Sequence, residues 1–246
     1  MEPETHKNKT PKFLNPKAQF IEGDVTKKED WMKSLEGIDS VVHLAALVGI
    51  GQSMYQPWRY MNVNTGGTAT FYQVLLENPE IRKGIKKIII AGSKTVYGEG
   101  TYRCKNCGIV YPSLRPREQL ERKDWEVHCP NCNEYVEPIG TTEDKPVNPL
   151  SVYALSKYAE ENLAFNYGFV FDIPTIIFRG FSIYGPRQSL DNPYSGVIAI
   201  FLNRLKNKKP PKIFEDGGSL RDYIYIEDVI EVLMRFLERE RSGIYN

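Results

Sequence analysis

The feature that most constrains the fold is a regular alternation of short apolar runs with longer amphipathic stretches between residues 18 and 180. The runs have the length and composition of buried strands, and the stretches have the period of helices. This alternation predicts a parallel sheet with helices on both faces, which is a doubly wound α/β fold. Thr26 and Glu29 are expected to form a capping box at the start of the first helix. The expected strands are 18–24, 40–46, 87–93 and 174–180, and the expected helices are 26–35, 54–77 and 152–167.

After residue 180 the sequence changes to turns and shorter elements. An apolar helix is expected over 196–205 and an amphipathic helix over 228–238, with short strands at 212–215 and 221–226. We therefore expect an α/β domain over 1–180, interrupted by an insert over 101–140, and a smaller second lobe over 181–246.

The composition excludes several classes of partner. The chain has 246 residues and a net charge of +1, and its Lys and Arg residues are scattered, so neither nucleic acid nor a membrane surface is an expected partner. The longest apolar run, 40–50, is interrupted by His43 and is too short to span a bilayer. The polar N-terminus does not resemble a signal peptide, so the sequence predicts a soluble, cytoplasmic protein.

All of the cysteines lie in the insert, as two Cys-x-x-Cys pairs. Each pair places two thiolates on one tight turn, and two such turns can complete a tetrahedral zinc site. Redox pairs or disulfides are the alternative, but nothing in the sequence indicates an oxidising compartment. A four-cysteine site is closed and therefore structural, and the metal would stabilise an insert that is poor in apolar residues. The predicted zinc ligands are Cys104, Cys107, Cys129 and Cys132.

Tyr153 and Lys157 are the first candidates for catalysis. They are four residues apart in a predicted helix, so their side chains share one face. A nearby ammonium stabilises a phenolate, which can then act as a general base. A single Tyr-x-x-x-Lys pair is weak evidence, because most such pairs lie on a solvated helix face. Its place after a strand that ends at Ser93 makes the interpretation stronger.

Seven motifs occur along the chain in a fixed order. They are Gly23-Asp24-Val25, His43-Leu-Ala-Ala46, Asn64-Thr-Gly-Gly-Thr68, Ser93-Lys-Thr-Val-Tyr-Gly98, Tyr153-x-x-x-Lys157, Phe178-Arg-Gly-Phe-Ser-Ile-Tyr-Gly-Pro-Arg187 and Arg221-Asp-Tyr-Ile-Tyr-Ile-Glu-Asp228. This set resembles the extended short-chain dehydrogenase/reductases that act on nucleotide-sugars. With the zinc insert, it is most similar to the branch of dTDP-L-rhamnose 4-epimerases, which is related to UDP-glucose 4-epimerases. The resemblance implies a Rossmann-like domain over 1–180 that binds NAD as cofactor, and a substrate-binding lobe over 181–246.

The resemblance also implies roles for individual residues. Tyr153 would take the proton of the sugar C4 hydroxyl, Lys157 would assist it and bind the nicotinamide ribose, and Ser93 would hydrogen-bond the sugar oxygen. The 4-keto sugar would then turn over and take the hydride back on its other face. The remaining cofactor contacts would be Asp24, Val25, Ala45, Ala46 and Asn64, and the remaining contacts to the nucleotide diphosphate would be Ser182, Asn192 and Arg221.

One local difference favours an epimerase over its relatives. In the dehydratases and decarboxylases of this superfamily, an acidic residue follows the Ser or Thr of the catalytic loop. Here that stretch is Ser93-Lys94-Thr95 and has no acid. This difference favours an epimerase, or a reductase, over a dehydratase.

The sequence also departs from the family pattern. The Gly-rich turn that follows the family's first strand, and the βαβ unit around it, are absent. Ser182 replaces the Asn that usually contacts the diphosphate, and the chain stops at Asn246, before the family's last elements. We therefore expect a truncated reading frame or a fragment that binds NAD poorly on its own.

Two alternatives remain open at this point. A reductase of the same superfamily that uses NADP would share all these motifs, because the residue that selects NAD or NADP lies in the missing part. A non-catalytic protein could use the zinc ribbon to bind a partner, although the mixed charges of 115–123 argue against nucleic acid. By analogy with the family, the chain is expected to form a homodimer through the 54–77 and 152–167 helices.

Overall fold

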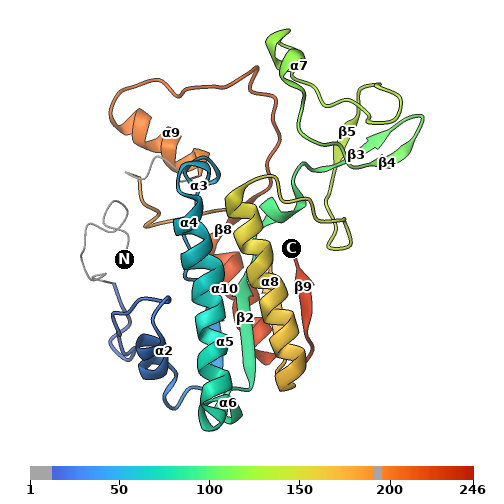
Figure 1. Cartoon of the computed structure of the whole chain (residues 1–246). Helices are drawn as coiled ribbons and strands as arrows, with labels where there is room; N and C mark the ends of the chain where they lie inside the picture. The colour runs from blue at the N-terminus through green and yellow to red at the C-terminus, as the bar shows by residue number, and fades with distance from the viewer. Residues whose placement is uncertain (1–12, 191–195) are drawn as a thin grey trace.

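A parallel four-stranded sheet lies at the centre of the molecule. The structure is a computed structural model, and it describes residues 13–190 and 196–246. The strands are β1 (Ser40–His43), β2 (Lys87–Ala91), β6 (Thr175–Phe178) and β9 (Gly243–Tyr245), in the order β1-β2-β6-β9 (Figure 1). Every neighbouring pair is parallel. The expected α/β sheet is therefore present.

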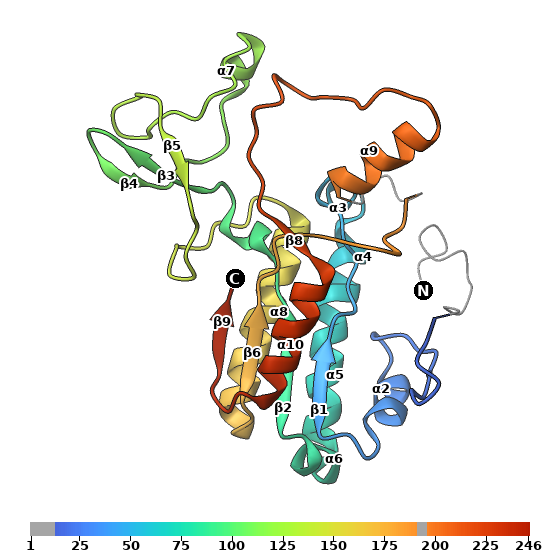
Figure 2. The same ribbon diagram turned by 180° about the vertical axis from the view of Figure 1, so that it is seen from behind.

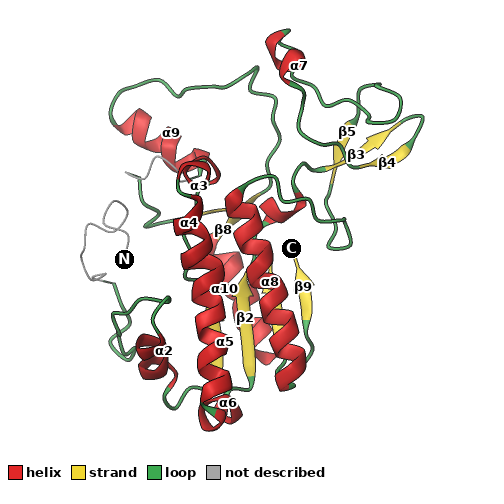
Figure 3. Ribbon diagram, viewed as in Figure 1, coloured by secondary structure: helices red, strands yellow, loops and turns green. Residues whose placement is uncertain are grey.

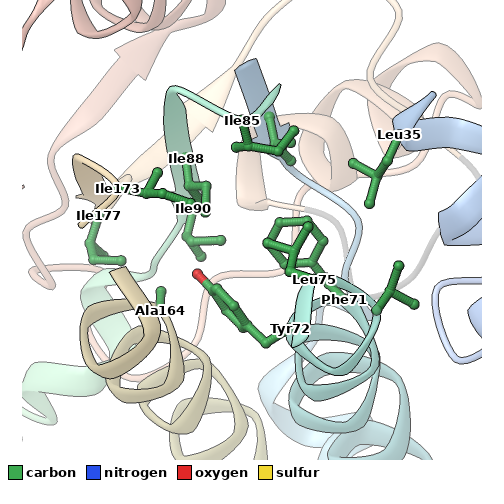
Figure 4. Packing of buried hydrophobic residues seen from close by; sticks show 12 residues of the cluster. Leu35, Phe71, Tyr72, Leu75, Ile85, Ile88, Ile90, Ala164, Ile173 and Ile177 are labelled. Carbon is green, nitrogen blue, oxygen red and sulfur yellow. The ribbon is translucent and has the colours of Figure 1, made fainter. Parts of the chain in front are cut away.

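Helices cover both faces of this sheet. The helices α5 (Gly67–Glu77) and α8 (Val152–Phe171) lie on one face, and α10 (Ile226–Glu238) lies on the other (Figure 2). Figure 4 shows why this arrangement is stable: side chains of α5 and α8 point toward Ile88, Ile90 and Ile177, which are fully buried. Burial of such side chains contributes roughly 1.5–3 kcal/mol each.

The predicted 54–77 helix is divided into four parts. It consists of α3 (Ile50–Tyr55), α4 (Pro57–Tyr60), the π-helix η1 (Met61–Gly66) and α5 (Figure 3). Pro57 explains the first break, because proline lacks the N–H group that would continue the helix. Gly67 allows close packing, since a Cβ atom there would lie 2.7 Å from Val25 Cγ2.

The N-terminal expectations are wrong in part. Residues 18–24 form no strand, because a strand needs a neighbouring backbone to pair with and none of the described residues supplies one. Helix α2 (Lys28–Leu35) begins two residues later than predicted. The capping box is also wrong: the Thr26 hydroxyl donates to Asp24 Oδ1 (2.8 Å), and Lys27 occupies the cap position without a side-chain bond.

The C-terminal segment differs from the expected separate lobe. A short helix, α9 (Val197–Lys206), and a two-stranded sheet of β7 (Ser182–Tyr184) and β8 (Tyr223–Tyr225) lie near the carboxyl end of the main sheet, while 212–215 forms no strand. However, α10 packs on the main sheet and β9 pairs with β6. Both elements therefore belong to the sheet domain, because their apolar faces are buried there.

The insert projects beyond the carboxyl ends of the strands (Figure 1). Its elements are β3 (Thr101–Cys104), β4 (Gly108–Val110), the short helix α7 (Arg117–Glu121) and β5 (Glu137–Ile139), and the strands form an antiparallel sheet in the order β4-β3-β5. Arg115 connects the insert to the loop between α9 and β8 through two bonds to the Glu215 carboxylate, of 2.9 and 3.0 Å.

Two further helices lie outside the insert. They are α6 (Pro79–Gly84) and the 3₁₀-helix η2 (Lys94–Tyr97).

Within the described residues, each helix is too short or too polar to cross a lipid bilayer.

His43, the last residue of β1, makes the stability of the fold dependent on pH. Its ring is buried, with Nε2 3.2 Å from Thr68 Oγ1, and burial, with the nearby Lys157 ammonium, lowers the pKa of His43 to about 4. Between pH 6.5 and 4 the unfolded chain therefore binds more protons than the folded chain, so stability falls as the pH falls. We expect this group to remove about 3 kcal/mol of unfolding free energy between pH 7 and pH 4.

Urea unfolding of the wild type and of His43→Leu across this pH range measures the effect. The variant should lack this part of the pH dependence, although its free energy at pH 7 will also change because Thr68 loses a partner. Parallel profiles for the two proteins would show that His43 is not responsible.

Candidate active site

A cleft of about 680 Å³ opens at the carboxyl ends of β1, β2 and β6. This is the edge at which doubly wound sheets bind their ligands. The loop after β1, η2, the start of α8, β7 and the start of α9 form its walls. The predicted site residues that line the cleft are Ala46, Ser93, Tyr153, Lys157 and Ser182.

Tyr153 is fixed at the first turn of α8. Ser151 caps this helix by accepting a bond from the Ala154 N–H group (3.1 Å), which satisfies a free donor of the first turn. The Tyr153 N–H group donates to Ser53 Oγ (3.0 Å), and the tyrosine ring packs edge-on against Tyr60, with 6.3 Å between the ring centres. The ring is 8% exposed, so its position is set by the protein rather than by solvent.

Ser93 also lines the cleft, two residues after the end of β2. It caps η2, and its hydroxyl oxygen lies 2.9 Å from Thr95 Oγ1 and accepts a weaker bond from the Thr95 N–H group (3.3 Å). The side chain is 6% exposed. The hydroxyl is thus held at the exit of the strand, as predicted.

Lys157 has a buried partner that the sequence did not predict. Its Nζ donates to Glu160 Oε2 (2.5 Å), and both side chains are at most 3% exposed. The other carboxylate oxygen, Glu160 Oε1, is buried without a hydrogen-bond partner. Burial raises the pKa of Glu160, against the opposite effect of the Lys157 charge. Lys157 is therefore part of an ion pair next to the cleft rather than an isolated cation.

A second buried ion pair supports the floor of the cleft. Arg179 donates to both carboxylate oxygens of Glu161, with a shortest distance of 2.7 Å, and the two side chains are 3% and 2% exposed. The Arg179 guanidinium also lies 4.7 Å from the centre of the Tyr97 ring. Gly92, which lines the cleft, leaves room for this pair, since a Cβ atom there would lie 2.7 Å from Glu161 Oε1.

Asn64 is buried below the cleft and does not line it. Its side chain bonds to both backbone groups of Leu47 (2.7 and 3.1 Å) and donates to Ser156 Oγ (2.9 Å). These bonds join the loop after β1 to α8. In this structure Asn64 therefore shapes the wall of the cleft.

The other predicted ligand contacts lie outside the cleft. Asp24 and Ala45 are exposed, and Val25 is partly buried against Gly67. Arg221 is exposed and bonds to Ser219 Oγ and to the Leu220 carbonyl (both 2.6 Å). Asn192 is outside the described residues.

The four cysteines converge in the insert. Their Sγ atoms all lie within 4.8 Å of one another, and Cys104 Sγ is 3.5 Å from Cys132 Sγ. Cys104 and Cys129 are buried in a small apolar core with Val110 and Val136. Four thiols at this spacing form the donor set that zinc prefers.

The cleft combines a phenol, a hydroxyl and a lysine ion pair at the edge of a parallel α/β sheet. A phenol next to a lysine can exchange a proton with a substrate alcohol, and the hydroxyl can hold the same oxygen. These groups lie at the edge of a parallel α/β sheet where such folds place their ligands, and they are of the kind that handle protons at an alcohol or ketone oxygen.

The chain belongs to the NAD dependent epimerase/dehydratase family, which residues 3–119 and 130–246 match. It is 32% identical over 247 residues to dTDP-L-rhamnose 4-epimerase from Burkholderia thailandensis, an alignment that covers 99% of this chain and 66% of the relative. The expected family is therefore confirmed.

Solved structures agree with this assignment. UDP-glucuronic acid 4-epimerase from Bacillus cereus has a TM-score of 0.69 and 28% identity, covering 94% of this chain and 60% of that one. UDP-N-acetylglucosamine 4-epimerase from Methanobrevibacter ruminantium M1 has a TM-score of 0.69 and 26% identity, covering 91% and 59%. The chain thus spans about two thirds or less of the length of these relatives.

Two residues of the site were missed by the sequence reasoning. Lys94 lines the cleft, and Glu160 pairs with Lys157. The signal for Lys94 was its place directly after Ser93 at a strand exit. Glu160 gave a weaker signal, since its spacing from Lys157 equally fits an exposed helix pair.

Proposed function

We propose that this chain carries the catalytic centre of an NAD-dependent nucleotide-sugar 4-epimerase. The observation that carries the proposal is that Ser93, Tyr153 and Lys157 meet at one cleft at the carboxyl ends of the strands. These residues are held in place by helix caps and by buried hydrogen bonds. The family shares this kind of chemistry, and its relatives include several 4-epimerases.

The cleft fits the nicotinamide end of NAD by its donors and its volume. Lys157 keeps N–H donors beyond the one bonded to Glu160 and can donate to a ribose hydroxyl, and Ala46 offers a small apolar wall. The adenine end has less support, because Asp24 and Ala45 lie outside the cleft. Bound NAD would supply a hydride acceptor and donor.

The chain's own residues would handle the proton and orient the sugar. Tyr153 takes the proton from the C4 hydroxyl as that carbon is oxidised to a ketone. Ser93 holds the same oxygen during this oxidation. The 4-keto sugar then turns over, so that its opposite face receives the hydride. Tyr153 then returns the proton to the C4 oxygen, and the overall reaction is redox-neutral.

The substrate class follows from the relatives. The Burkholderia relative is named for dTDP-L-rhamnose, and the Bacillus cereus structure contains UDP-glucuronic acid and NAD. We propose a dTDP-L-rhamnose-like or UDP-glucose-like substrate, in which the sugar is carried by a nucleoside diphosphate.

The test is incubation of the 246-residue chain with NAD and each of dTDP-L-rhamnose, UDP-glucose and UDP-glucuronic acid. Chromatography would separate the C4 epimers, while absorbance would follow reduced cofactor. Interconversion of epimers without net change in cofactor supports the proposal. Net consumption of NADPH with a 4-keto sugar would favour a reductase instead, and no turnover with retained NAD binding would contradict an epimerase.

We also propose that the four cysteines bind one structural zinc ion. The convergence of the Sγ atoms within 4.8 Å supports a closed site, and the small core of the insert gives little other stabilisation. We expect one zinc per chain in metal analysis and cobalt–thiolate absorption after exchange.

Cys107→Ser and Cys132→Ser should each lose this metal, and the insert should become sensitive to proteases because its folding depends on the metal. Met32→Ser changes an exposed residue outside the insert and serves as the control. Retention of stoichiometric zinc in both cysteine variants would rule out a four-cysteine site.

A homodimer is the remaining proposal. Large apolar side chains are exposed on the α3–α4 segment and on α8, among them Tyr55 (85%), Trp58 (75%) and Phe169 (89%). Exposed groups of this size are typical of protein interfaces. Light scattering after gel filtration tests it, and a monomer at all concentrations would contradict it.

A further inference from the structure

Lys94 occupies the cleft next to the catalytic residues but has no part in the proton transfer proposed above. It follows Ser93 at the start of η2, and its Nζ donates to Ser182 Oγ (2.7 Å) on the facing strand β7. Its ammonium also lies 5.8 Å from the centre of the Phe181 ring. An ammonium has three N–H donors, so two remain beyond the bond to Ser182.

Lys94 has no ion-pair partner among the described residues. No carboxylate there forms an ion pair with its Nζ, and the charged groups that act on it are Arg221, of the same sign, and Asp222, of the opposite sign. Burial and the Arg221 charge lower the pKa of Lys94. A half-buried lysine without an anionic partner is costly, and a negatively charged ligand would offset this cost.

The pairing of β7 with β8 brings a second cation, Arg221, toward Lys94 and Ser182. Ser182, the partner of Lys94, pairs with Tyr223 in the β7–β8 sheet, and its N–H group donates to the Asp222 carbonyl (3.1 Å). Arg221 directly precedes this segment. The side chains available on this wall are therefore an ammonium, a hydroxyl and, nearby, an exposed guanidinium.

We propose that Lys94 is a substrate-binding residue that contacts an anionic oxygen of the nucleotide-sugar. This inference rests on the proposed function and specifies the recognition at that site. Two sources of such an oxygen fit the position: the diphosphate, which Arg221 would share, and a carboxylate on the sugar itself, since Ser93 is the adjacent residue. Lys94 would supply the positive charge that binds this oxygen, because Ser182 on the same wall offers only a hydroxyl.

Calorimetry on the whole chain, with inorganic pyrophosphate, UDP, UDP-glucose and UDP-glucuronic acid, tests the inference. The variants are Lys94→Met, which keeps the length of the side chain, and Lys94→Arg, which keeps the charge. Lys209→Met, at an exposed lysine outside the cleft, is the matched control. Unfolding curves would establish that all of the variants fold.

We expect Lys94→Met to weaken binding about 10- to 100-fold, the effect of losing one charge-assisted hydrogen bond, and Lys94→Arg to restore much of it. Weaker binding of pyrophosphate and UDP assigns the contact to the diphosphate. Weaker binding of UDP-glucuronic acid with UDP and UDP-glucose unchanged assigns it to a sugar carboxylate.

Unchanged affinity for all of the ligands that the wild type binds, in a folded Lys94→Met protein, would overturn the inference. Wild-type chain that binds none of these ligands would overturn both the inference and the proposed function. Lys94-dependent binding of pyrophosphate or UDP without any epimerisation would contradict the proposed function alone.

Discussion

Tyr153→Phe is expected to lower the turnover number about 10²- to 10⁴-fold, the usual contribution of one general acid–base group. The substitution removes the phenol oxygen and keeps the ring, which packs on Tyr60 and is 8% exposed. Stability and NAD affinity should therefore stay close to those of the wild type. Steady-state rates with the substrate identified as above, together with NAD titration, measure both effects.

The matched control is Tyr158→Phe on the same helix, since Tyr158 does not line the cleft. It should leave the turnover number within about twofold. If Tyr153→Phe retained more than about a tenth of the wild-type rate, another group would have to act as the base.

The second large effect is on stability. Breaking the buried Arg179–Glu161 pair by Glu161→Leu should lower the free energy of unfolding by about 3–5 kcal/mol, because it leaves the Arg179 charge buried without its partner. The double variant Glu161→Leu/Arg179→Met removes both charges and should recover much of the loss. Denaturant unfolding of the three proteins gives these differences directly.

The exposed pair Arg235–Glu231 provides the control. Both of its side chains are more than half exposed, so Glu231→Gln should cost less than about 1 kcal/mol. A double variant as unstable as Glu161→Leu would show that packing around these side chains, rather than the unpaired charge, determines the loss.

Elements with strong local patterns were predicted well from the sequence. The strand β2 and the helix α8 lie within a few residues of their expected positions, because an isoleucine run and a long helical segment are strong signals on their own. The paired cysteines were also expected to converge, and their Sγ atoms do lie together. The strand and the helix depend mainly on neighbours in the sequence, whereas the two cysteine pairs were expected to meet because one metal ion needs four ligands.

Features that depend on distant partners could not be predicted in the same way. Residues 18–24 have a strand-like composition, but no described backbone lies beside them to accept their hydrogen bonds. Glu160 and Glu161 look alike in the sequence, yet each carboxylate meets a different buried cation. Glu160 meets Lys157 of its own helix, whereas the partner of Glu161 is Arg179, which the packing of α8 against the end of β6 supplies and the sequence pattern does not contain.

The Arg115–Glu215 contact gives the cysteine-containing insert a mechanical role. Through this contact the insert holds the loop between α9 and β8 in position, and the same loop contains Arg221. Deletion of 101–140 would therefore remove a contact that fixes the loop between α9 and β8. The insert is part of the structure that supports the cleft, and a shortened enzyme should keep it.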